Sequence, residues 1–256
     1  GLIIQELDTG KNVVFQWRSW DHFQITDAAP TVSLTAATID YVHGNAVELD
    51  HDGNLLVSSR HLNEITKISR TTGEVLWRLG RNARRNQFTF DNDARGFSYQ
   101  HDIRRLPNGH ITLYDNGNFL TPQYSRALEY EIDEAGRRAT LVWQYRNTPD
   151  TYGPFMGNIQ RRPGGGTMIG WGGTNPNPKL TDLHPDGTKA FELGMASGTW
   201  SYRAFRLPWR TNRFVTDRTS LDFGEVLLGE TGSRTLTVRN PSATEVTLAC
   251  LISTHA

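Results

Sequence analysis

Two stretches of the chain share one layout: HGNAVELDHDGNLLVSSR at residues 43–60 and YQHDIRRLPNGHITLYDNG at residues 99–117. Each begins with a strand-like segment that carries a histidine near its start. A glycine turn follows, and a second strand-like segment then ends in polar residues. The turn glycines Gly53 and Gly109 lie 56 residues apart, and Gly165 lies 56 residues further on. This spacing predicts one β unit that is repeated along the chain.

The outer part of each unit also repeats, as two strand-like segments joined by a turn. These hairpins are expected at residues 65–78, 128–144 and 180–193, with a fourth at 3–17. Each unit therefore contains four strands, and a period near fifty with four strands is typical of a propeller blade. We expect an all-β fold in which a β-propeller with four-stranded blades contains three nearly whole units, at 42–90, 98–150 and 155–197.

The predicted blades are too few to close a ring. The outer strands of a fourth blade precede the three units, and one further inner strand, at 201–208, follows them. Closed propellers have four to eight blades. We therefore expect this propeller to be incomplete, either because N-terminal blades are missing or because a partner closes the ring, and we favour the first explanation.

Composition limits the classes of partner. The 256 residues carry 27 basic and 27 acidic side chains, so the zero net charge gives no indication of electrostatic capture of nucleic acid. No apolar run approaches the roughly 20 residues that span a bilayer, and no signal peptide is visible. The single cysteine, Cys250, excludes an intrachain disulfide, and we expect it to be buried in a strand.

The sequence changes character at about residue 214. The stretches LDFGEVLLGET at 221–231 and RTLTVRNP at 234–241 resemble the start of an immunoglobulin-like module. About 43 residues remain, whereas a complete sandwich of this kind has about 100. We therefore predict two domains, a partial propeller at 1–213 and a truncated β-sandwich module at 214–256.

Several motifs together resemble the bacterial arylsulfate sulfotransferases of the propeller type. The motifs are HGN at 43–45, DGN at 52–54, SSR at 58–60, GEVLWRLG at 73–80, QHD at 100–102, DNG at 115–117 and SRA at 125–127. The resemblance covers residues 1–210. It implies a six-bladed propeller that moves a sulfuryl group from an aryl sulfate ester to a phenol without a nucleotide donor. It also implies a histidine nucleophile that is transiently sulfated, with assistance from other histidines and an arginine in the central channel.

The resemblance assigns roles to particular residues. His43 and His101 would be catalytic residues of the channel, and Arg126 would bind the sulfate, because a guanidinium fork suits a tetrahedral oxyanion. Arg126 could instead stabilise its own blade through Asp115. Candidate substrate-binding residues are Arg60, for which a structural role is the alternative, the hydrogen-bond donors Asn45 and Asn116, and Trp171, which could stack on an aryl ring or belong to the core.

The remaining histidines and tryptophans are expected to have structural roles. His51, His110 and His184 lie in or beside turns, where they are solvated, whereas His22 could line the channel entrance or lie at an edge. Trp17, Trp77 and Trp143 recur in the hairpins and are expected in the core.

One position departs from the family pattern. Gly157 stands in the third unit where the second has His101, and His184 is the one further histidine before the C-terminal module. Either His43 or His101 is then the nucleophile, or the chain is a divergent member with altered activity.

The sequence leaves three functions open. The first is an exported enzyme, periplasmic or extracellular, that transfers sulfuryl groups by a ping-pong mechanism through a sulfohistidine between a small aryl sulfate and a phenol. The second is a non-catalytic module that binds a sulfated or phenolic ligand or a protein partner, and the third is a structural repeat. The sequence has no HExxH zinc motif and no phosphate-binding loop, so we expect no metal and no cofactor.

Overall fold

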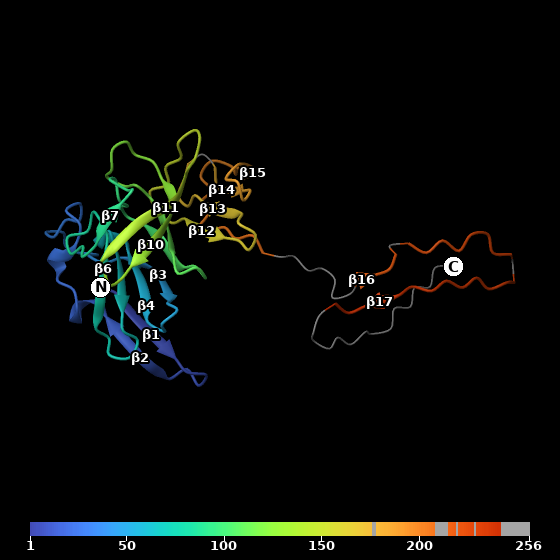
Figure 1. Cartoon of the computed structure of the whole chain (residues 1–256), viewed down its shortest axis with the longest axis horizontal. Coiled ribbons are helices and arrows are strands. Elements are labelled where there is room, and N and C mark those ends of the chain that lie inside the picture. The colour runs from blue at the N-terminus through green and yellow to red at the C-terminus, as the bar shows by residue number, and fades with distance from the viewer. Residues whose placement is uncertain (176–177, 208–214, 219, 228, 242–256) are drawn as a thin grey trace. The chain divides into compact units, whose positions relative to one another are not determined.

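The predicted four-stranded blades are present. The computed structural model describes residues 1–175, 178–207, 215–218, 220–227 and 229–241 (Figure 1). The first blade contains β3 (Gly44–Leu49), β4 (Leu55–Ser59), β5 (Glu64–Ile68) and β6 (Val75–Leu79). The second contains β8 (His101–Arg105), β9 (Ile111–Asp115), β10 (Arg126–Asp133) and β11 (Arg138–Arg146). The third contains β12 (Asn158–Arg161), β13 (Thr167–Gly170), β14 (Leu180–Leu183) and β15 (Lys189–Leu193). The prediction of an all-β propeller with four-stranded blades is therefore confirmed.

Strands outside these blades follow the same plan. The hairpin of β1 (Ile3–Leu7) and β2 (Val13–Arg18) forms a two-stranded sheet, as expected for the outer half of a preceding blade. The short strand β7 (Thr89–Asp91) pairs in parallel with β11 and adds a fifth strand to the second blade. The described residues contain three short 3-10 helices, η1 (Ser19–Asp21), η2 (Ile25–Asp27) and η3 (Arg60–Leu62), and none is long and apolar enough to cross a membrane.

Polar side chains on the first strand of each blade hold it to the next blade. The side-chain amide of Asn45 donates to the carbonyl of Gln100, and its oxygen accepts the backbone N–H of Asp102. The Asp102 carboxylate accepts the N–H of Ile159 in the third blade. Asn158 then exchanges two hydrogen bonds with the backbone of Ala204. Because residues 45, 102 and 158 lie one repeat apart, this is one inter-blade contact made three times.

Apolar side chains fill the space between neighbouring blades. Trp77 belongs to the core between the first and second blades, Trp17 to the core beside the β1–β2 hairpin, and Trp171 to the core between the second and third blades. Trp17 and Trp77 are thus buried as expected, whereas Trp143 is partly buried and lies under the guanidinium of Arg161. These cores fix the first two strands of each blade, where the polar candidates are located.

The chain divides into two units, 1–206 and 207–256. In the second unit the described strands are β16 (Val215–Thr216) and β17 (Val238–Arg239), which pair antiparallel. The immunoglobulin-like character of this region stays a prediction. The expected burial of Cys250 falls outside the described residues.

Candidate active site

Residues from the first two blades meet beside the segment that enters the third. His43 directly precedes β3, Arg60 and His61 begin η3 directly after β4, and His101 is the first residue of β8. The β3–β4 ladder continues past the strand ends, since the N–H of Arg60 donates to the carbonyl of His43 and the N–H of His61 donates to that of Val42. This ladder places the two histidines of the first blade side by side.

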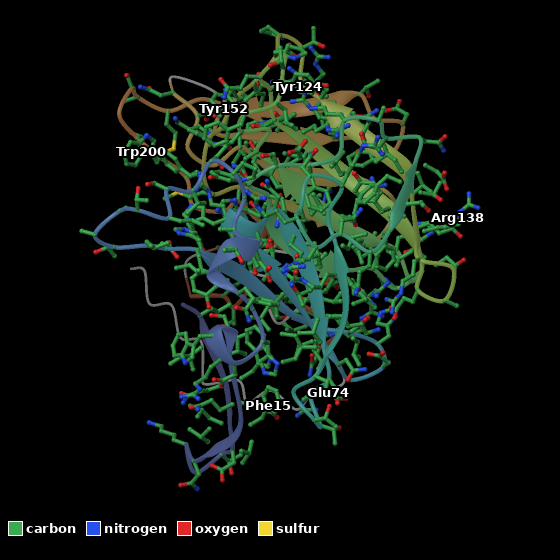
Figure 2. All side chains as sticks on the ribbon, turned by 90° about the vertical axis from the view of Figure 1, so that its left-hand side faces the viewer. Phe15, Glu74, Tyr124, Arg138, Tyr152 and Trp200 are labelled. Atoms are coloured by element: carbon green, nitrogen blue, oxygen red, sulfur yellow. The ribbon has the colours of Figure 1, made fainter. Side chains whose placement is uncertain are left out.

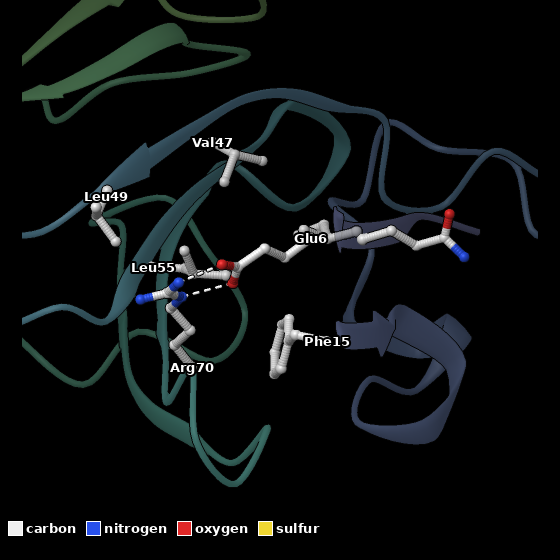
Figure 3. A pocket seen from close by; sticks show the side chains of 8 residues that line it. Glu6, Phe15, Val47, Leu49, Leu55 and Arg70 are labelled. Carbon is white, nitrogen blue, oxygen red and sulfur yellow. Dashed lines mark hydrogen bonds and ion pairs between the residues drawn. The ribbon is translucent and has the colours of Figure 1, made fainter. Parts of the chain in front are cut away.

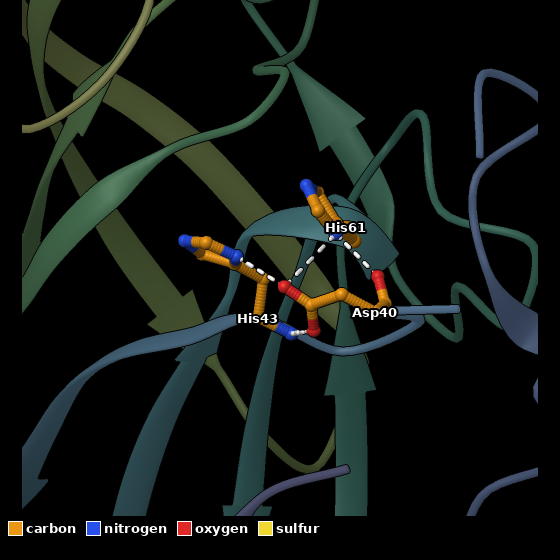
Figure 4. A group of neighbouring side chains, drawn as sticks. All are labelled: Asp40, His43 and His61. Atoms are coloured by element: carbon orange, nitrogen blue, oxygen red, sulfur yellow. Dashed lines mark hydrogen bonds and ion pairs between the residues drawn. The ribbon is translucent and has the colours of Figure 1, made fainter. Parts of the chain in front are cut away.

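Asp40, His43 and His61 form a compact cluster (Figure 4). The Nδ1 atom of His43 donates to the Asp40 carboxylate at 2.5 Å, and the backbone N–H of His43 donates to the same carboxylate at 3.2 Å. His61 Nδ1 donates to the Asp40 carbonyl at 2.5 Å, and the two imidazole centroids are 4.7 Å apart. Burial raises the pKa of Asp40, but the hydrogen bonds from His43 outweigh burial and leave it below its ordinary value. The His43–Asp40 pair is therefore arranged to carry a proton.

Arg60 connects this cluster to the second blade. Its guanidinium lies over the ring of Tyr99 at 4.1 Å from the centroid, and its Nη2 donates to the carbonyl of Pro154 at 3.0 Å. Its Nη1 donates to Nε2 of His61 at 2.7 Å. The Nε atom is buried and has no partner among the described residues. Arg60 thus has hydrogen-bonding capacity left for an anion.

His101 is 5% exposed and is held in one tautomer. Its Nδ1 donates to the side-chain oxygen of Asn116 at 2.8 Å and lies 3.1 Å from the Tyr99 carbonyl, so this nitrogen carries the proton. Its Nε2 accepts the backbone N–H of Met156 at 3.2 Å. Burial lowers the pKa of His101 to about 4, and the positive charges of Arg60 and His43 contribute to the decrease. At neutral pH the ring is therefore uncharged, with its lone pair on Nε2.

Arg126 does not join this group. Its guanidinium bonds to Asp115 through Nε at 3.0 Å, to Asp93 through Nη2 at 3.0 Å and to Gln144 through Nη1 at 2.8 Å. A further bond goes to the carbonyl of Gly96, and Arg126 is 3% exposed. The structure thus favours the alternative role, in which Arg126 stabilises the second blade through Asp115. A sulfate would have to displace these buried carboxylates to reach it.

The three residues that directly follow the second strand of each blade, Arg60, Asn116 and Trp171, have different surroundings. Asn116 is fully buried and orients His101, while its amide donates to the carbonyls of Gly153 and Met156. Trp171 is 0% exposed and donates through Nε1 to Thr181, so it is a core residue and offers no face to an aryl ring. Asn45, also proposed to bind substrate, makes the inter-blade contact described above.

The glycine that replaces a histidine in the third unit has a packing reason. Gly157 has φ = 99°, and a Cβ atom there would lie 2.5 Å from the ring of Tyr114. Its amide also donates to the carbonyl of Tyr202. His184 is exposed in its turn, as is His51, whereas His110 is half-buried and bonds to Glu129 at 2.8 Å. His22 is exposed and stacks on Trp17.

The sequence analysis did not select Asp40, His61 or Tyr99. His61 directly follows the SSR motif, and Asp40 precedes His43 by three residues, a spacing that lets an aspartate accept the histidine N–H in a turn. Tyr99 stands within the quoted second stretch. Its ring is 5.3 Å from that of His61 and 5.2 Å from that of Phe119, which is 63% exposed.

A separate pocket lies at the other end of the first blade and does not belong to this cluster. It has a volume of about 230 Å³ and is lined by apolar side chains together with the ion pair of Glu6 and Arg70 (Figure 3). Phe15, which lines it, lies at the end of the propeller unit opposite to Tyr152 (Figure 2). Tyr152 is close enough to Arg60 for the guanidinium to oppose the effect of burial, which raises the pKa of Tyr152.

The fold and the cluster together define the class of protein: a β-propeller whose inner strands gather two or more histidines and an arginine at one place. The sequence profile of the arylsulfotransferase (ASST) family matches residues 3–203, and the chain belongs to this family. Arylsulfate sulfotransferase AssT of Escherichia coli O6:H1 (strain CFT073) is 28% identical. The alignment covers 53% of this chain and 28% of that relative, so the chain spans well under half of the relative's length.

Three solved structures are similar in part. A protein of unknown function from Bacteroides caccae has a TM-score of 0.48 at 13% identity, over 75% of this chain and 59% of that one. The PQQ-bound aldose sugar dehydrogenase of Streptomyces coelicolor has a TM-score of 0.40 at 19% identity, over 62% and 51%. Virginiamycin B lyase of Staphylococcus aureus has a TM-score of 0.39 at 11% identity, over 77% and 49%.

Proposed function

We propose that the chain is the part of an aryl sulfotransferase that transfers a sulfuryl group from an aryl sulfate ester to a phenol by a ping-pong mechanism. Family membership supports sulfotransferase chemistry in general. The observation that carries the finer proposal is the contrast between its two histidines. His101 is kept neutral by burial, whereas His43 is paired with a carboxylate. Two titratable groups whose environments differ in this way are suited to different roles.

His101 is the proposed nucleophile. A neutral imidazole with its proton fixed on Nδ1 presents the Nε2 lone pair, which attacks sulfur while the bond between sulfur and the aryl oxygen breaks. Nε2 now accepts the N–H of Met156, at a distance that is long for such a bond. Attack therefore requires the Met156 amide to leave the lone pair when the sulfate ester enters.

His43 is the proposed acid and base. Its Nδ1 is bonded to Asp40, and among the described residues its Nε2 has no hydrogen-bond partner. A protonated His43 gives its proton to the departing phenolate. The resulting neutral ring then takes the proton of the acceptor phenol, whose oxygen attacks sulfur while the N–S bond to His101 breaks. Asp40 stabilises the charged form of His43 in each half of the cycle.

Arg60 is the proposed sulfate-binding residue, in place of Arg126. Its guanidinium is fixed over Tyr99, carries an unpaired N–H at Nε and lies near enough to His101 to lower the pKa of that ring. A cation at this place offsets the negative charge of the sulfate oxygens as the S–O bond breaks. Export to the periplasm or the extracellular space is part of the same proposal.

A non-catalytic binding module is the second candidate. The observation that favours it is that both ring nitrogens of His101 have partners in this structure. In that case Arg60 and His43 would hold an anionic ligand, and no covalent intermediate would form.

The test combines turnover with trapping of the intermediate. The chain is incubated with 4-nitrophenyl sulfate and phenol, and the acid-labile sulfate on histidine is measured after donor alone is added. We expect release of 4-nitrophenol, sulfate on histidine in the unaltered protein, and loss of both in H101A. The exposed-turn variant H184A is the matched control and should behave like the unaltered chain. Normal transfer by H101A would refute the nucleophile assignment, and binding of donor without any sulfohistidine would support the binding module.

A further inference from the structure

We propose that Asp40, His43 and His61 form a binding site for a divalent transition-metal ion such as Zn²⁺. The three side chains each offer one ligand atom, and these atoms lie within 4.8 Å of one another. Two imidazole nitrogens and one carboxylate oxygen are a ligand set that suits Zn²⁺, Ni²⁺ or Co²⁺. Three protein ligands leave coordination positions for water or an anion.

The backbone holds these ligands in place without a metal. The hydrogen bonds of residues 60 and 61 to the carbonyls of residues 43 and 42 fix the two histidines on neighbouring segments. The Asp40 carboxylate accepts the N–H of His43, which fixes the turn between them. A ligand set that is already positioned loses little conformational entropy when an ion binds.

The distances require only side-chain rotation. His43 Nδ1 is 2.5 Å and His61 Nδ1 is 3.8 Å from the Asp40 Oδ2 atom. Ligand atoms that are each about 2.1 Å from a tetrahedral zinc ion are separated by roughly 3.4 Å. The first distance must therefore open by about as much as a proton is replaced by a larger ion, and the second must shorten slightly. The side chains of Asp40 and His43 are nearly half exposed, so an ion has a path from solvent.

Arg60 competes with the metal for His61. At present His61 accepts a hydrogen bond from Arg60 at Nε2 and carries its proton on Nδ1. When a metal binds Nδ1, the ring proton moves to Nε2, where it meets the Arg60 guanidinium, and both cations repel each other. Metal binding and the Arg60–His61 hydrogen bond therefore exclude each other. This competition predicts that removal of the guanidinium strengthens metal binding.

A consequence follows that rests on the proposed function. A metal at this site occupies His43 and displaces Arg60, so it should inhibit sulfuryl transfer. Metal binding itself is measured without an aryl sulfate, so failure of the metal site and failure of the proposed function are distinguished.

The experiment is calorimetric titration of the whole chain with Zn²⁺ at neutral pH, with Co²⁺ absorption as a spectroscopic check. We expect one strong site per chain, weakened at least tenfold in H61Q and strengthened severalfold in R60M. H184Q, which removes an exposed turn histidine, is the control for non-specific binding and should bind like the unaltered protein. Equal affinities of H61Q and the unaltered chain would overturn the site. An R60M affinity equal to or weaker than that of the unaltered chain would overturn the competition, and it remains informative if H61Q fails to fold.

Discussion

Replacement of Arg126 by methionine separates a structural from a sulfate-binding role for this residue. The guanidinium lies between Asp93 and Asp115, whose side chains are 2% and 0% exposed. Removal of one partner from a buried ion pair costs about 3–5 kcal/mol, because the other charge is left without compensation. Asp115 keeps its bonds from the N–H groups of Ser98 and Gly117, which keeps the cost within this range.

The assay is thermal unfolding of R126M beside R60M. For a unit of about this size, each kcal/mol lowers Tm by about 2–4 °C, so R126M should melt roughly 6–20 °C below the unaltered protein. Arg60 makes fewer and more exposed contacts, so R60M should melt within about 5 °C of the unaltered protein while losing sulfuryl transfer. The reasoning is refuted if R126M keeps the Tm of the unaltered protein and loses transfer, since Arg126 would then act on the substrate.

Three further outcomes follow from the buried groups. The pKa of His101 is about 4 in the folded chain and near 6.5 when unfolded, so the unfolded chain binds more protons between these values. Stability should be full above pH 6.5 and fall by up to about 3 kcal/mol as the pH drops to 4, which urea unfolding of the unaltered chain and H101Q will show as a slope that the variant lacks. N116A should lower kcat by on the order of tenfold to a hundredfold, as seen for groups that orient metal-bound histidines, with little change in KM, and an equal loss in both would contradict a positioning role. W171A should lower the free energy of unfolding by about 3–5 kcal/mol by leaving a cavity, and a loss of substrate affinity without destabilisation would restore the stacking role.

The blades could be predicted from sequence because the repeat itself carries the information. Strand alternation, the turn glycines and the hairpin tryptophans recur at one spacing, and each recurrence supports the others. The spacing also identified the places where polar side chains follow a strand. What the spacing does not give is the direction in which each of these side chains points, and that decides whether a residue binds a ligand or supports the fold.

His43 and His101 illustrate this limit. The inter-blade contact is made by Asn45 in the first blade and by Asp102 in the second, which makes these two residues equivalent. His43 is therefore two residues and His101 one residue before the equivalent position. Because successive side chains of a strand point to opposite faces, an offset of one residue is enough to give two histidines different surroundings. One is half-exposed beside Asp40, and the other is buried beside Asn116.

Arg126 and Arg60 show the second limit, which is the identity of partners that are distant in sequence. Arg126 belongs to a family-like motif, but Asp93, 33 residues away, and Asp115 occupy its guanidinium. Arg60 follows a strand in the same way, yet its nearest contacts are an aromatic ring and a backbone carbonyl. Neither pairing has a local signal in the sequence, so a carboxylate-bound and an available arginine could not be distinguished there.

The backbone between residues 153 and 156 is what makes the candidate site one unit. Arg60 of the first blade donates to the carbonyl of Pro154, and the Asn116 amide of the second donates to those of Gly153 and Met156. The N–H of Met156 in turn donates to Nε2 of His101. An anion that draws Arg60 away from Pro154 removes one of the bonds that position this segment, and the Met156 N–H is on the same segment. Binding at Arg60 and release of the His101 lone pair are thereby coupled through four residues of main chain, so the nucleophile is unmasked by the ligand that it attacks.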